Sequence, residues 1–494
     1  MKNDRLSIKN AQMAGNPGII FCFIMLLSTS VMAQTQNSFA GSKTAFMHDD
    51  ALSSDVFTGA APEGNVQFSF STKMGAVPTL LLGSDGLLQV ICVRNENKGA
   101  SIEQTPYLLL LQPETLQTLA SLKLPAGRAL NNIYGYLNEK DELMLANGNN
   151  IFRIRHTKNN TEWSFTIAQT FTLKTPDKDF QFVAITPDWK GNIWFVSYNS
   201  IAGFLNPGNG KFTSVKLSRK KDEIVANSIS ASPDGIAIAT TYALYMLHQY
   251  KNKPAIIWKA NYDRGNRVKP GQLSWGTGSS PTFFGEKTGF EYVTILDAGT
   301  NGTHLNIYNT KTGTMAAQQL AFGCDVAQGS ENSPIGYKNS VIIASTYGFQ
   351  YPASSSATTE VSALKKGMQR IDVLPGGTGA KSVWFNKEVR TTSVPKLGKE
   401  KQAVYFIDQD DNGDYFYTEV DYQTGKLLNK IKLTIDPYSV LPDAGKLSEA
   451  QKKEMLQRIG DPFNPIQMAG LFDGEGNLYQ GTILGILKIS SPNK

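Results

Sequence analysis

Cysteine, histidine and charge are scarce in this sequence. Its 494 residues include only three cysteines and four histidines, and 18% of the residues are charged. The cysteines provide neither a disulfide framework nor the spacing of a zinc site. Disorder and coiled coil are excluded as well, because 41% of the residues are hydrophobic. No serine lies in a G-x-S-x-G elbow, which excludes a hydrolase of the α/β type.

Neither positive nor negative charge dominates the sequence. The formal net charge is +6, and lysine and arginine are interspersed with acids, without a block of five or six basic residues. We therefore expect no nucleic acid and no anionic membrane as a partner. The few histidines likewise leave nucleophilic catalysis with little support.

Only one long apolar run occurs, and it lies near the start of the chain. Residues 18–31 are almost entirely apolar and follow Lys2, Arg5 and Lys9. This pattern predicts a secretory signal peptide over 1–33 with cleavage after Ala33. The run is too short to span a membrane comfortably, so we expect a soluble, exported protein, periplasmic or extracellular.

Glycine, with 44 residues, and aromatic side chains, at 10%, are abundant. Both are typical of many short strands joined by tight turns. Eight turn signals, each between two apolar strands, recur mostly 44 to 60 residues apart. They lie at 84–86, 139–141, 189–191, 233–235, 286–289, 337–339, 397–399 and 473–476. A period of this size indicates a propeller or a solenoid.

A second turn follows the first in four of the eight units, which predicts that each unit is a four-stranded meander. The second turns lie at 112–115, 206–208, 309–313 and 422–425. The eighth unit ends after its third strand, and the alternating residues 65–72, NVQFSFST, can supply the fourth. We predict an all-β fold over 65–494, an eight-bladed β-propeller whose last blade is closed by this N-terminal strand. Seven blades are the alternative.

Two segments fall outside the repeats. Residues 34–64 have no strand pattern and predict a flexible lead-in. Residues 447–459 predict a short helical insertion laid over one face, with Ser448 as its N-cap and Gly460 after its end. Cys92 and Cys324 fall in separate repeats, and whether they pair is left open.

The turns at YNTKTGTMA and VDYQTGKLL carry a D/N-x-x-T-G pattern between two strands. This pattern resembles the quinoprotein-alcohol-dehydrogenase-like superfamily of eight-bladed propellers. The resemblance covers nearly the whole mature chain and implies the same fold. Members that hold pyrroloquinoline quinone carry a tryptophan a few residues after the T-G, where this chain has Met315 and Leu428, and an adjacent cysteine pair that this chain lacks. The resemblance therefore implies the fold without the quinone.

Residues 408–419 match the calcium-loop pattern D-x-[DN]-x-[DN]-G-x5-E in full. The flanking residues alternate like strands, whereas an EF-hand requires helices. Two interpretations remain: an acidic solvated turn, and a hairpin loop that binds calcium. The calcium ligands of the second interpretation are Asp408, Asp410, Asn412 and Asp414.

The most elaborate loops belong to the fifth and sixth repeats, on the face where propellers usually bind. They combine carboxylate, imidazole, guanidinium and aromatic side chains, as a pocket for a polar small molecule or a sugar would. The catalytic candidates are His304, Glu331 and Arg264. The ligand-binding candidates are Trp275, Asp297, Asn332, Tyr347 and Tyr351. Each of these candidate residues also has a purely structural interpretation, such as packing between blades or capping a turn.

Two function classes follow. The first is a monomeric, exported propeller that binds a small polar ligand, a glycan or a partner protein on its loop face. The alternative is a propeller enzyme with its site near the fifth and sixth blades, a lyase or hydrolase acting on sugars or esters, or less favoured a quinoprotein-type oxidoreductase. The fold cannot decide between them, because propellers carry both.

Overall fold

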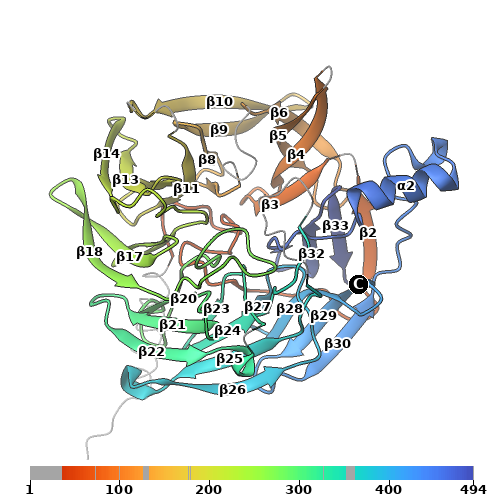
Figure 1. The fold of residues 1–494 in the computed structure, drawn as a ribbon. Coiled ribbons are helices and arrows are strands. Elements are labelled where there is room, and N and C mark those ends of the chain that lie inside the picture. The colour runs from red at the N-terminus through yellow and green to blue at the C-terminus, as the bar shows by residue number, and fades with distance from the viewer. Residues whose placement is uncertain are drawn as a thin grey trace, which may run out of the picture.

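The computed structural model describes residues 36–492, apart from 73, 99–100, 126–132, 176, 178–179, 326 and 352–361. The predicted signal peptide and its cleavage site lie outside the described residues. The described strands form eight sheets, seven of four strands and one of five, arranged around a central axis (Figure 1). The prediction of an eight-bladed propeller is confirmed, and the seven-bladed alternative is wrong.

The first four blades follow one another along the chain, each with its strands in sequence order from the axis outward. Blade 1 contains β3 (Ala76–Leu82), β4 (Leu88–Lys98), β5 (Ser101–Leu111) and β6 (Thr118–Lys123). Blade 2 contains β7 (Tyr136–Leu137), β8 (Leu143–Asn147), β9 (Asn150–Asn159) and β10 (Glu162–Thr172). Blade 3 contains β11 (Phe182–Pro187), β12 (Ile193–Ser197), β13 (Ile201–Asn206) and β14 (Lys211–Lys216). Blade 4 contains β15 (Ser230–Ser232), β16 (Gly235–Ala239), β17 (Ala243–Tyr250) and β18 (Lys253–Asn261).

The other blades repeat this order, with two additions from the N-terminal part of the chain. Blade 5 contains β19 (Thr282–Phe284), β20 (Tyr292–Leu296), β21 (His304–Asn309) and β22 (Met315–Leu320). Blade 6 contains β23 (Ile335–Tyr337), β24 (Ser340–Ala344), β25 (Met368–Val373) and β26 (Ala380–Asn386). Blade 7 contains β1 (Val56–Phe57), β27 (Lys396–Gly398), β28 (Ala403–Gln409), β29 (Tyr415–Asp421) and β30 (Leu427–Lys432). Blade 8 contains β31 (Leu471–Phe472), β32 (Asn477–Gly481), β33 (Ile486–Ser490) and β2 (Gln67–Ser71).

The ring is closed by β2, which was predicted from residues 65–72. This strand pairs antiparallel with β33, from Gln67 opposite Ser490 to Ser71 opposite Ile486. The outer strand of the last blade thus comes from the beginning of the propeller domain, and the chain that leads from β2 to β3 links the last blade to the first.

The turns that set the blade period depend on an Asp or Asn at the end of an inner strand. The side chains of Asn138, Asp188 and Asp473 each accept hydrogen bonds from the backbone N–H groups two and four residues later. These bonds fold the chain back locally. Since the signal is local, the turns could be recognised without knowledge of the whole fold.

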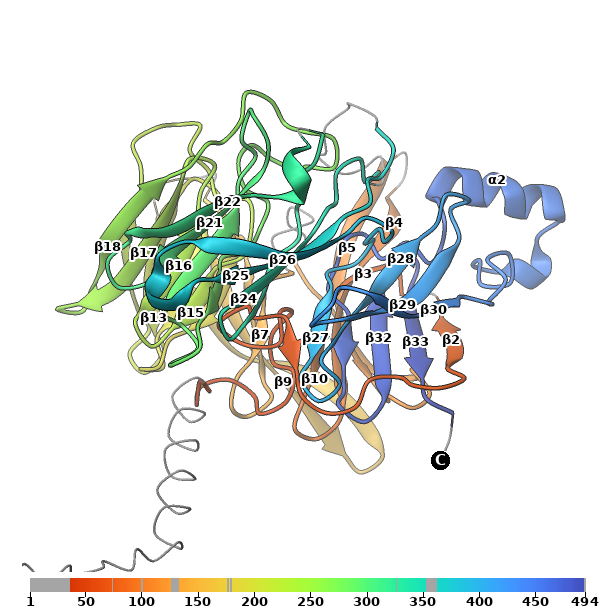
Figure 2. The same cartoon turned by 90° about the horizontal axis from the view of Figure 1, so that it is seen from below.

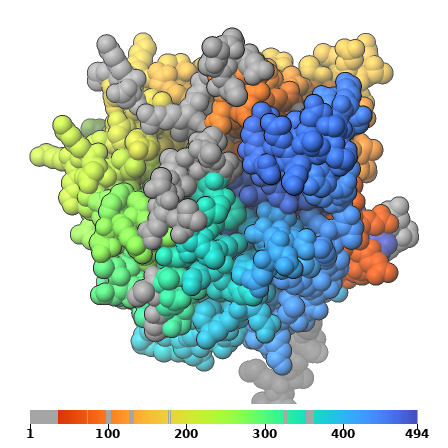
Figure 3. Space-filling model, turned by 45° about the vertical axis from the view of Figure 1, so that its right-hand side comes forward, coloured from red at the N-terminus to blue at the C-terminus, as the bar shows by residue number. Residues whose placement is uncertain are grey.

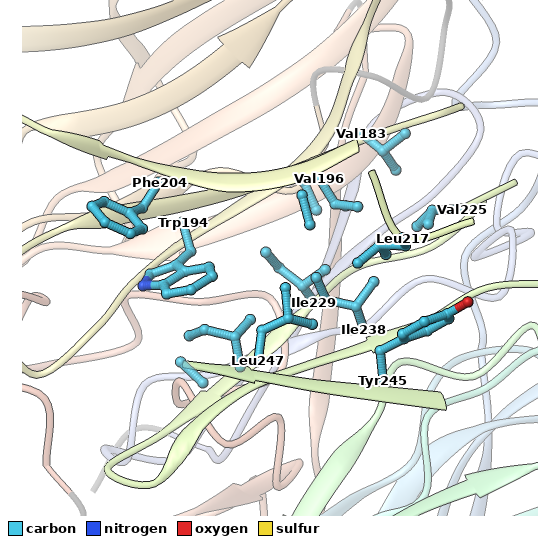
Figure 4. Close-up of a cluster of buried hydrophobic side chains, with 14 of the residues drawn as sticks. Val183, Trp194, Val196, Phe204, Leu217, Val225, Ile229, Ile238, Tyr245 and Leu247 are labelled. Carbon is cyan, nitrogen blue, oxygen red and sulfur yellow. The ribbon is translucent and has the colours of Figure 1, made fainter. Parts of the chain in front are cut away.

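Neighbouring blades pack through apolar and aromatic side chains. Between blades 3 and 4, Trp194 and Phe204 belong to the same buried cluster as Tyr245 and Leu247 (Figure 4). Burial of such aromatic surface is the main stabilising contribution to a fold of this kind.

Two further tryptophans dock one blade onto the next. Trp258 of β18 lies against Gly313 in the T-G turn of blade 5 and donates its indole N–H to the Thr310 carbonyl at 2.8 Å. Trp384 of β26 lies in the same way against Gly425 of blade 7 and donates to the Tyr422 carbonyl at 2.9 Å. The T-G turns therefore receive a tryptophan from the preceding blade. The positions at which the family resemblance implies a tryptophan, Met315 and Leu428, lie within the same repeats as the turns.

Residues 36–64, here called the channel segment, enter the centre of the ring (Figures 1 and 2). Six backbone N–H groups of inner strands, in blades 1, 2, 4, 5, 6 and 7, donate to its carbonyls over 2.7–3.0 Å. The donors are Leu82, Leu137, Ala231, Phe283, Gly336 and Leu397, and the acceptors are Thr44, Ala45, Ala51, Leu52, Ser54 and Asp55. Asn37 bonds to the Pro187 carbonyl of blade 3, and Ala60 to Gly474 of blade 8. The flexible lead-in predicted for 34–64 needs correction here, since contacts to every blade fix its described part.

Helix α2 (Glu449–Ile459) lies where the sequence predicts one, between blades 7 and 8. Ser448 and Gln451 form a reciprocal capping box at its start. The dark-blue insertion forms a bulge on the surface of the molecule (Figure 3). Within the described residues, no helix has the length and apolar character needed to cross a membrane.

The two cysteines outside the predicted signal peptide lie in different parts of the ring. Cys92 is a free thiol on β4 of blade 1, and Cys324 lies in the short helix η1 (Phe322–Cys324) after blade 5. Burial raises the pKa of the Cys92 thiol to about 11, so it stays protonated at neutral pH.

Candidate functional site

Glu331 is the most perturbed carboxyl group of the predicted site. It lies four residues before the inner strand β23, and therefore at one end of the central channel. The Leu273 backbone N–H donates to the carboxyl, but Oε1 is buried and has no hydrogen-bond partner. Burial raises the pKa of Glu331 to about 8, so the group is mostly a neutral acid at pH 7.

Two tyrosines stand close to this carboxyl. They are Tyr134, just before β7, and Tyr351, in the loop between β24 and β25. Burial raises the pKa of both hydroxyls, and the negative charge of Glu331 raises them further. The Tyr134 hydroxyl donates to Asn227 Oδ1 at 2.6 Å. Both phenols stay protonated at neutral pH and offer polar groups beside the acid.

Gly278 makes room for the Glu331 side chain. A Cβ atom at this position would overlap the carboxyl group, so no other residue fits without displacing it. The Gly278 carbonyl accepts a hydrogen bond from Asn227 Nδ2. Tyr134, Asn227, Gly278, Glu331 and Tyr351 together are called the mouth cluster below. They come from blades 2, 4, 5 and 6 and their connections.

Arg264 and Trp275 form a second group, on the connection between blades 4 and 5. The Arg264 guanidinium lies 3.8 Å from the ring centre of Tyr242 and 4.8 Å from that of Trp275. It also pairs with Asp222 at 3.3 Å. Trp275 is 38% exposed. The pair therefore presents an aromatic surface with its cation already held in place.

Asp297 and His304 form a third group, in blade 5. The Asp297 carboxylate accepts from the His304 backbone N–H at 2.7 Å and from Asn306 Nδ2 at 3.0 Å. The His304 ring lies beside it, with Nδ1 3.3 Å from Oδ2. Burial raises the pKa of Asp297. Asp297 thus holds the loop between β20 and β21, and its contacts join it to His304 rather than to Glu331.

Asn332 and Tyr347 lie in blade 6 beside the mouth cluster. Asn332 is buried and donates to the Ser393 carbonyl at 3.3 Å, while its Oδ1 has no partner. Tyr347 is buried near Gly329 and Lys269. The structure therefore brings Glu331, Asn332 and Tyr351 to the channel end and leaves the Arg264 and His304 groups as separate neighbours.

A polar network in the channel was not predicted from the sequence. His48 of the channel segment places Nδ1 3.0 Å from Asp55 Oδ1 and Nε2 3.3 Å from Ser280 Oγ. Ser333 donates to Asp55 Oδ2 at 2.5 Å, and Ser228 donates to Ser280. No motif could reveal this group, because its members lie up to 285 residues apart.

The order Ser280, His48, Asp55 is that of a serine nucleophile with its base and orienting acid. The adjoining cavity, however, has a volume of only about 30 Å³, and Ser280 is 2% exposed. Such a space holds about one water molecule and no substrate. The network therefore holds the channel segment in the ring.

The predicted calcium loop forms the hairpin turn between β28 and β29. Asp408 pairs with Lys430 at 2.6 Å and Asp414 with Lys432 at 2.5 Å. The Asp410 carboxylate accepts from the backbone N–H groups of Asn412 and Asp414. In the described part of the chain, no three His, Cys, Asp or Glu side chains converge as metal ligands would. Calcium binding here stays one of the two interpretations.

A hollow of the surface lies away from these groups, at the outer edge of the ring. It is a groove of about 680 Å³ between the outer strands β2 and β30. Its lining includes Val66, Phe68, Ile431 and the cation Lys432, and it offers no converging acid–base groups. The chemistry is therefore concentrated at the channel, not at this groove.

No protein-family model and no curated protein sequence matches the chain. Several solved propeller structures are similar to it. Virginiamycin B lyase from Staphylococcus aureus is 10% identical over 87% of this chain and all of that one, with a TM-score of 0.39. The RRP9 WD40 repeats are 9% identical over 70% of this chain and 91% of that one, at 0.42. A Lactobacillus plantarum protein is 13% identical over 69% and 95%, at 0.40. At identities this low, the functions of these proteins are not transferred to this chain.

Proposed function

We propose that this chain is an exported propeller that binds a small polar ligand at the mouth cluster. The observation that carries the proposal is Glu331, a neutral acid whose buried Oε1 has no hydrogen-bond partner. A buried polar atom without a partner costs free energy, and a ligand group that bonds to it removes that cost. Tyr134 and Tyr351 offer further hydroxyl groups beside it.

The groups of the mouth cluster favour a ligand rich in hydroxyl or carbonyl groups. Glu331 in its acid form both donates and accepts a hydrogen bond, and phenol groups do the same. No cation of the described chain pairs with Glu331. A sugar or another neutral polyol fits this set better than a phosphate or a nucleic acid, which require positive charge.

A binding screen on the purified mature protein tests the proposal. Neutral sugars, oligosaccharides and polar metabolites are the probes, with thermal shift and calorimetry as the readouts. We expect Glu331→Ala to weaken binding at least tenfold, and Trp275→Ala to weaken it if the ligand reaches blade 4. Glu454→Gln changes an exposed glutamate on α2 and serves as the control. Unchanged affinity in both Glu331→Ala and Trp275→Ala contradicts this placement.

The alternative is an enzyme at the same site, and the pKa of Glu331 favours it. An acid with a pKa of about 8 can donate or accept a proton near neutral pH, as general acid–base catalysis by a lyase or hydrolase requires. Product analysis of any ligand found decides between the two. Glu331→Gln should abolish turnover and retain binding if the chain is an enzyme. Intact ligand after prolonged incubation with wild-type protein supports the binding function.

We also infer that the chain is a divergent relative of the quinoprotein-alcohol-dehydrogenase-like propellers. The support is the docking of Trp258 and Trp384 onto the glycines of the two T-G turns. The export proposal rests on residues 1–33. N-terminal sequencing of the secreted protein tests it, and Gln34 is the expected first residue.

A further inference from the structure

The channel segment is held by the ring as a bound peptide would be. Its carbonyls accept hydrogen bonds from six inner strands, and β1 pairs in parallel with β27, Val56 opposite Leu397 and Phe57 opposite Gly398. Inner strands of a blade have a free edge toward the channel. The segment uses these edges one after another, as an added peptide uses the edge of a sheet.

The charges of the segment and the ring are complementary. Asp49 pairs with Lys396 of β27 at 2.9 Å, and both side chains are buried. The same Lys396 ammonium donates to the Met47 carbonyl at 3.1 Å. Burial raises the pKa of Asp50, and the charge of Lys399 of the ring is among the effects that oppose this rise. Two lysines of the ring therefore face the acidic segment. Removal of either partner of a buried ion pair such as Asp49–Lys396 is strongly destabilising.

Hydroxyl groups of three successive blades complete the recognition. Ser230 of blade 4 bonds to Ser53, Ser280 before blade 5 to His48, and Ser333 before blade 6 to Asp55. Each of these serines lies within two residues of the start of its inner strand or at that start. Three repeats therefore present a serine hydroxyl at the same place in the blade to three polar residues of one peptide.

The covalent link between the segment and the propeller is short and exposed. Gly64 and Asn65 lie in a surface turn between the segment and β2, and nothing approaches the position of a Cβ at Gly64. This turn adds no contact to the channel itself. The tether raises the local concentration of the segment but is not part of its recognition.

We propose that the channel is a peptide-binding site for an acidic, extended segment, and that residues 36–64 occupy it as a tethered ligand. The ring formed by residues 65–492 then binds this segment without the covalent link. The channel is closed to other molecules while the segment is in place, so ligands reach the mouth cluster from its outer side only.

Cleavage of the folded protein tests this inference. A protease site is inserted between Gly64 and Asn65, and the purified protein is cut under native conditions. We expect the fragment to co-elute with the ring in gel filtration at micromolar concentration, with the melting temperature unchanged within about 2 °C. The same site inserted at Lys251–Asn252, in the exposed β17–β18 turn, controls for the effect of a nick alone. A fragment that elutes separately, or a ring that unfolds when cut, overturns the proposal.

A second set of variants tests the chemistry of recognition in the cut protein. Lys396→Met should increase the rate of fragment release at least tenfold, and so should Asp49→Asn. Lys311→Met removes an exposed lysine of blade 5 and should leave the rate unchanged. Equal release rates for Lys396→Met and Lys311→Met contradict the assignment of Lys396 to peptide recognition. Ligand binding at the mouth cluster is measured separately, so either proposal can fail alone.

Discussion

At the scale of single residues, Glu331 combines burial with an unsatisfied polar atom. Its pKa in the folded protein is raised to about 8 from an ordinary 4.5. The folded state therefore holds the proton more tightly than the unfolded state. The contribution of this proton to the free energy of unfolding is fully present below about pH 4.5. It is lost as the pH rises through 8.

Glu331→Gln should separate this titration from the rest of the protein. The amide remains neutral at every pH, so we expect a melting temperature a few degrees above wild type at pH 9 and near wild type at pH 5. Differential scanning calorimetry at both values measures it. Glu454→Gln should change neither value. An equal shift at pH 5 and pH 9 would show that the substitution acts through packing and not through the charge.

The sequence could name Glu331 but not its surroundings. A glutamate at the entrance to an inner strand, beside long loops, was a reasonable candidate. Tyr134 and Asn227 approach it from blades 2 and 4, at distances along the chain that no local pattern reports. Arg264 and His304 were placed in the same group because their loops are neighbours, whereas the folded loops give each its own partner.

At the scale of elements, the docking of one blade onto the next is concentrated in few side chains. Trp384 is 9% exposed and contacts Gly425 of the following blade, while Trp275 is 38% exposed on a loop. We expect Trp384→Ala to reduce the free energy of unfolding by about 3 to 5 kcal/mol, as for buried aromatic residues. Trp275→Ala should cost less than about 1 kcal/mol. Denaturant unfolding of both variants gives the comparison, and equal losses would contradict the docking role.

The β28–β29 turn allows a separate prediction about calcium. Lys430 and Lys432 already pair with Asp408 and Asp414, so a calcium ion would have to displace both lysines. We expect the melting temperature to stay within about 1 °C in millimolar calcium and in excess chelator. Asp410→Ala should lower stability by about 1 kcal/mol in either solution, because it removes the bonds that close the turn. A calcium-dependent rise lost in Asp410→Ala would establish the metal site.

Turns and strands were the elements that the sequence predicted best. Five of the eight first turns lie entirely between β-strands at the predicted residues, and those at 233–235 and 337–339 overlap a strand by one residue. The turn placed at 397–399 lies at 399–402, after β27. Asp, Asn and Gly determine the conformation of the backbone within a few residues of their own position, so such turns can be predicted from a short stretch of sequence. The channel segment has no such periodicity. Its structure comes from distant partners such as Lys396 and Ser280, so the sequence pattern alone predicts a flexible lead-in.

At the scale of the whole molecule, the ring depends on a closure that joins its first and last parts. Five residue pairs between β2 and β33 supply it, and Phe70 of β2 packs edge-on against Phe463 at 5.1 Å. Without β2, blade 8 would expose the edge of β33 and the apolar cluster beneath it. Since each blade packs on two neighbours, loss at one point weakens the whole ring.

Replacing the β2 side chains tests this closure without shortening the chain. Phe68→Ser combined with Phe70→Ser removes the two aromatic contacts of β2 with the cluster that includes Tyr417 and Leu487. We expect the melting temperature to fall by roughly 5 °C, since two partly buried aromatic side chains contribute several kcal/mol and 1 kcal/mol corresponds to about 1 °C in a protein of more than about 400 residues. Gln67→Ser and Ser69→Ala, on the opposite face of β2, form the matched control and should shift it by less than about 2 °C. A double variant that melts like this control would show that the ring is held closed elsewhere, with the channel segment as the next element to examine.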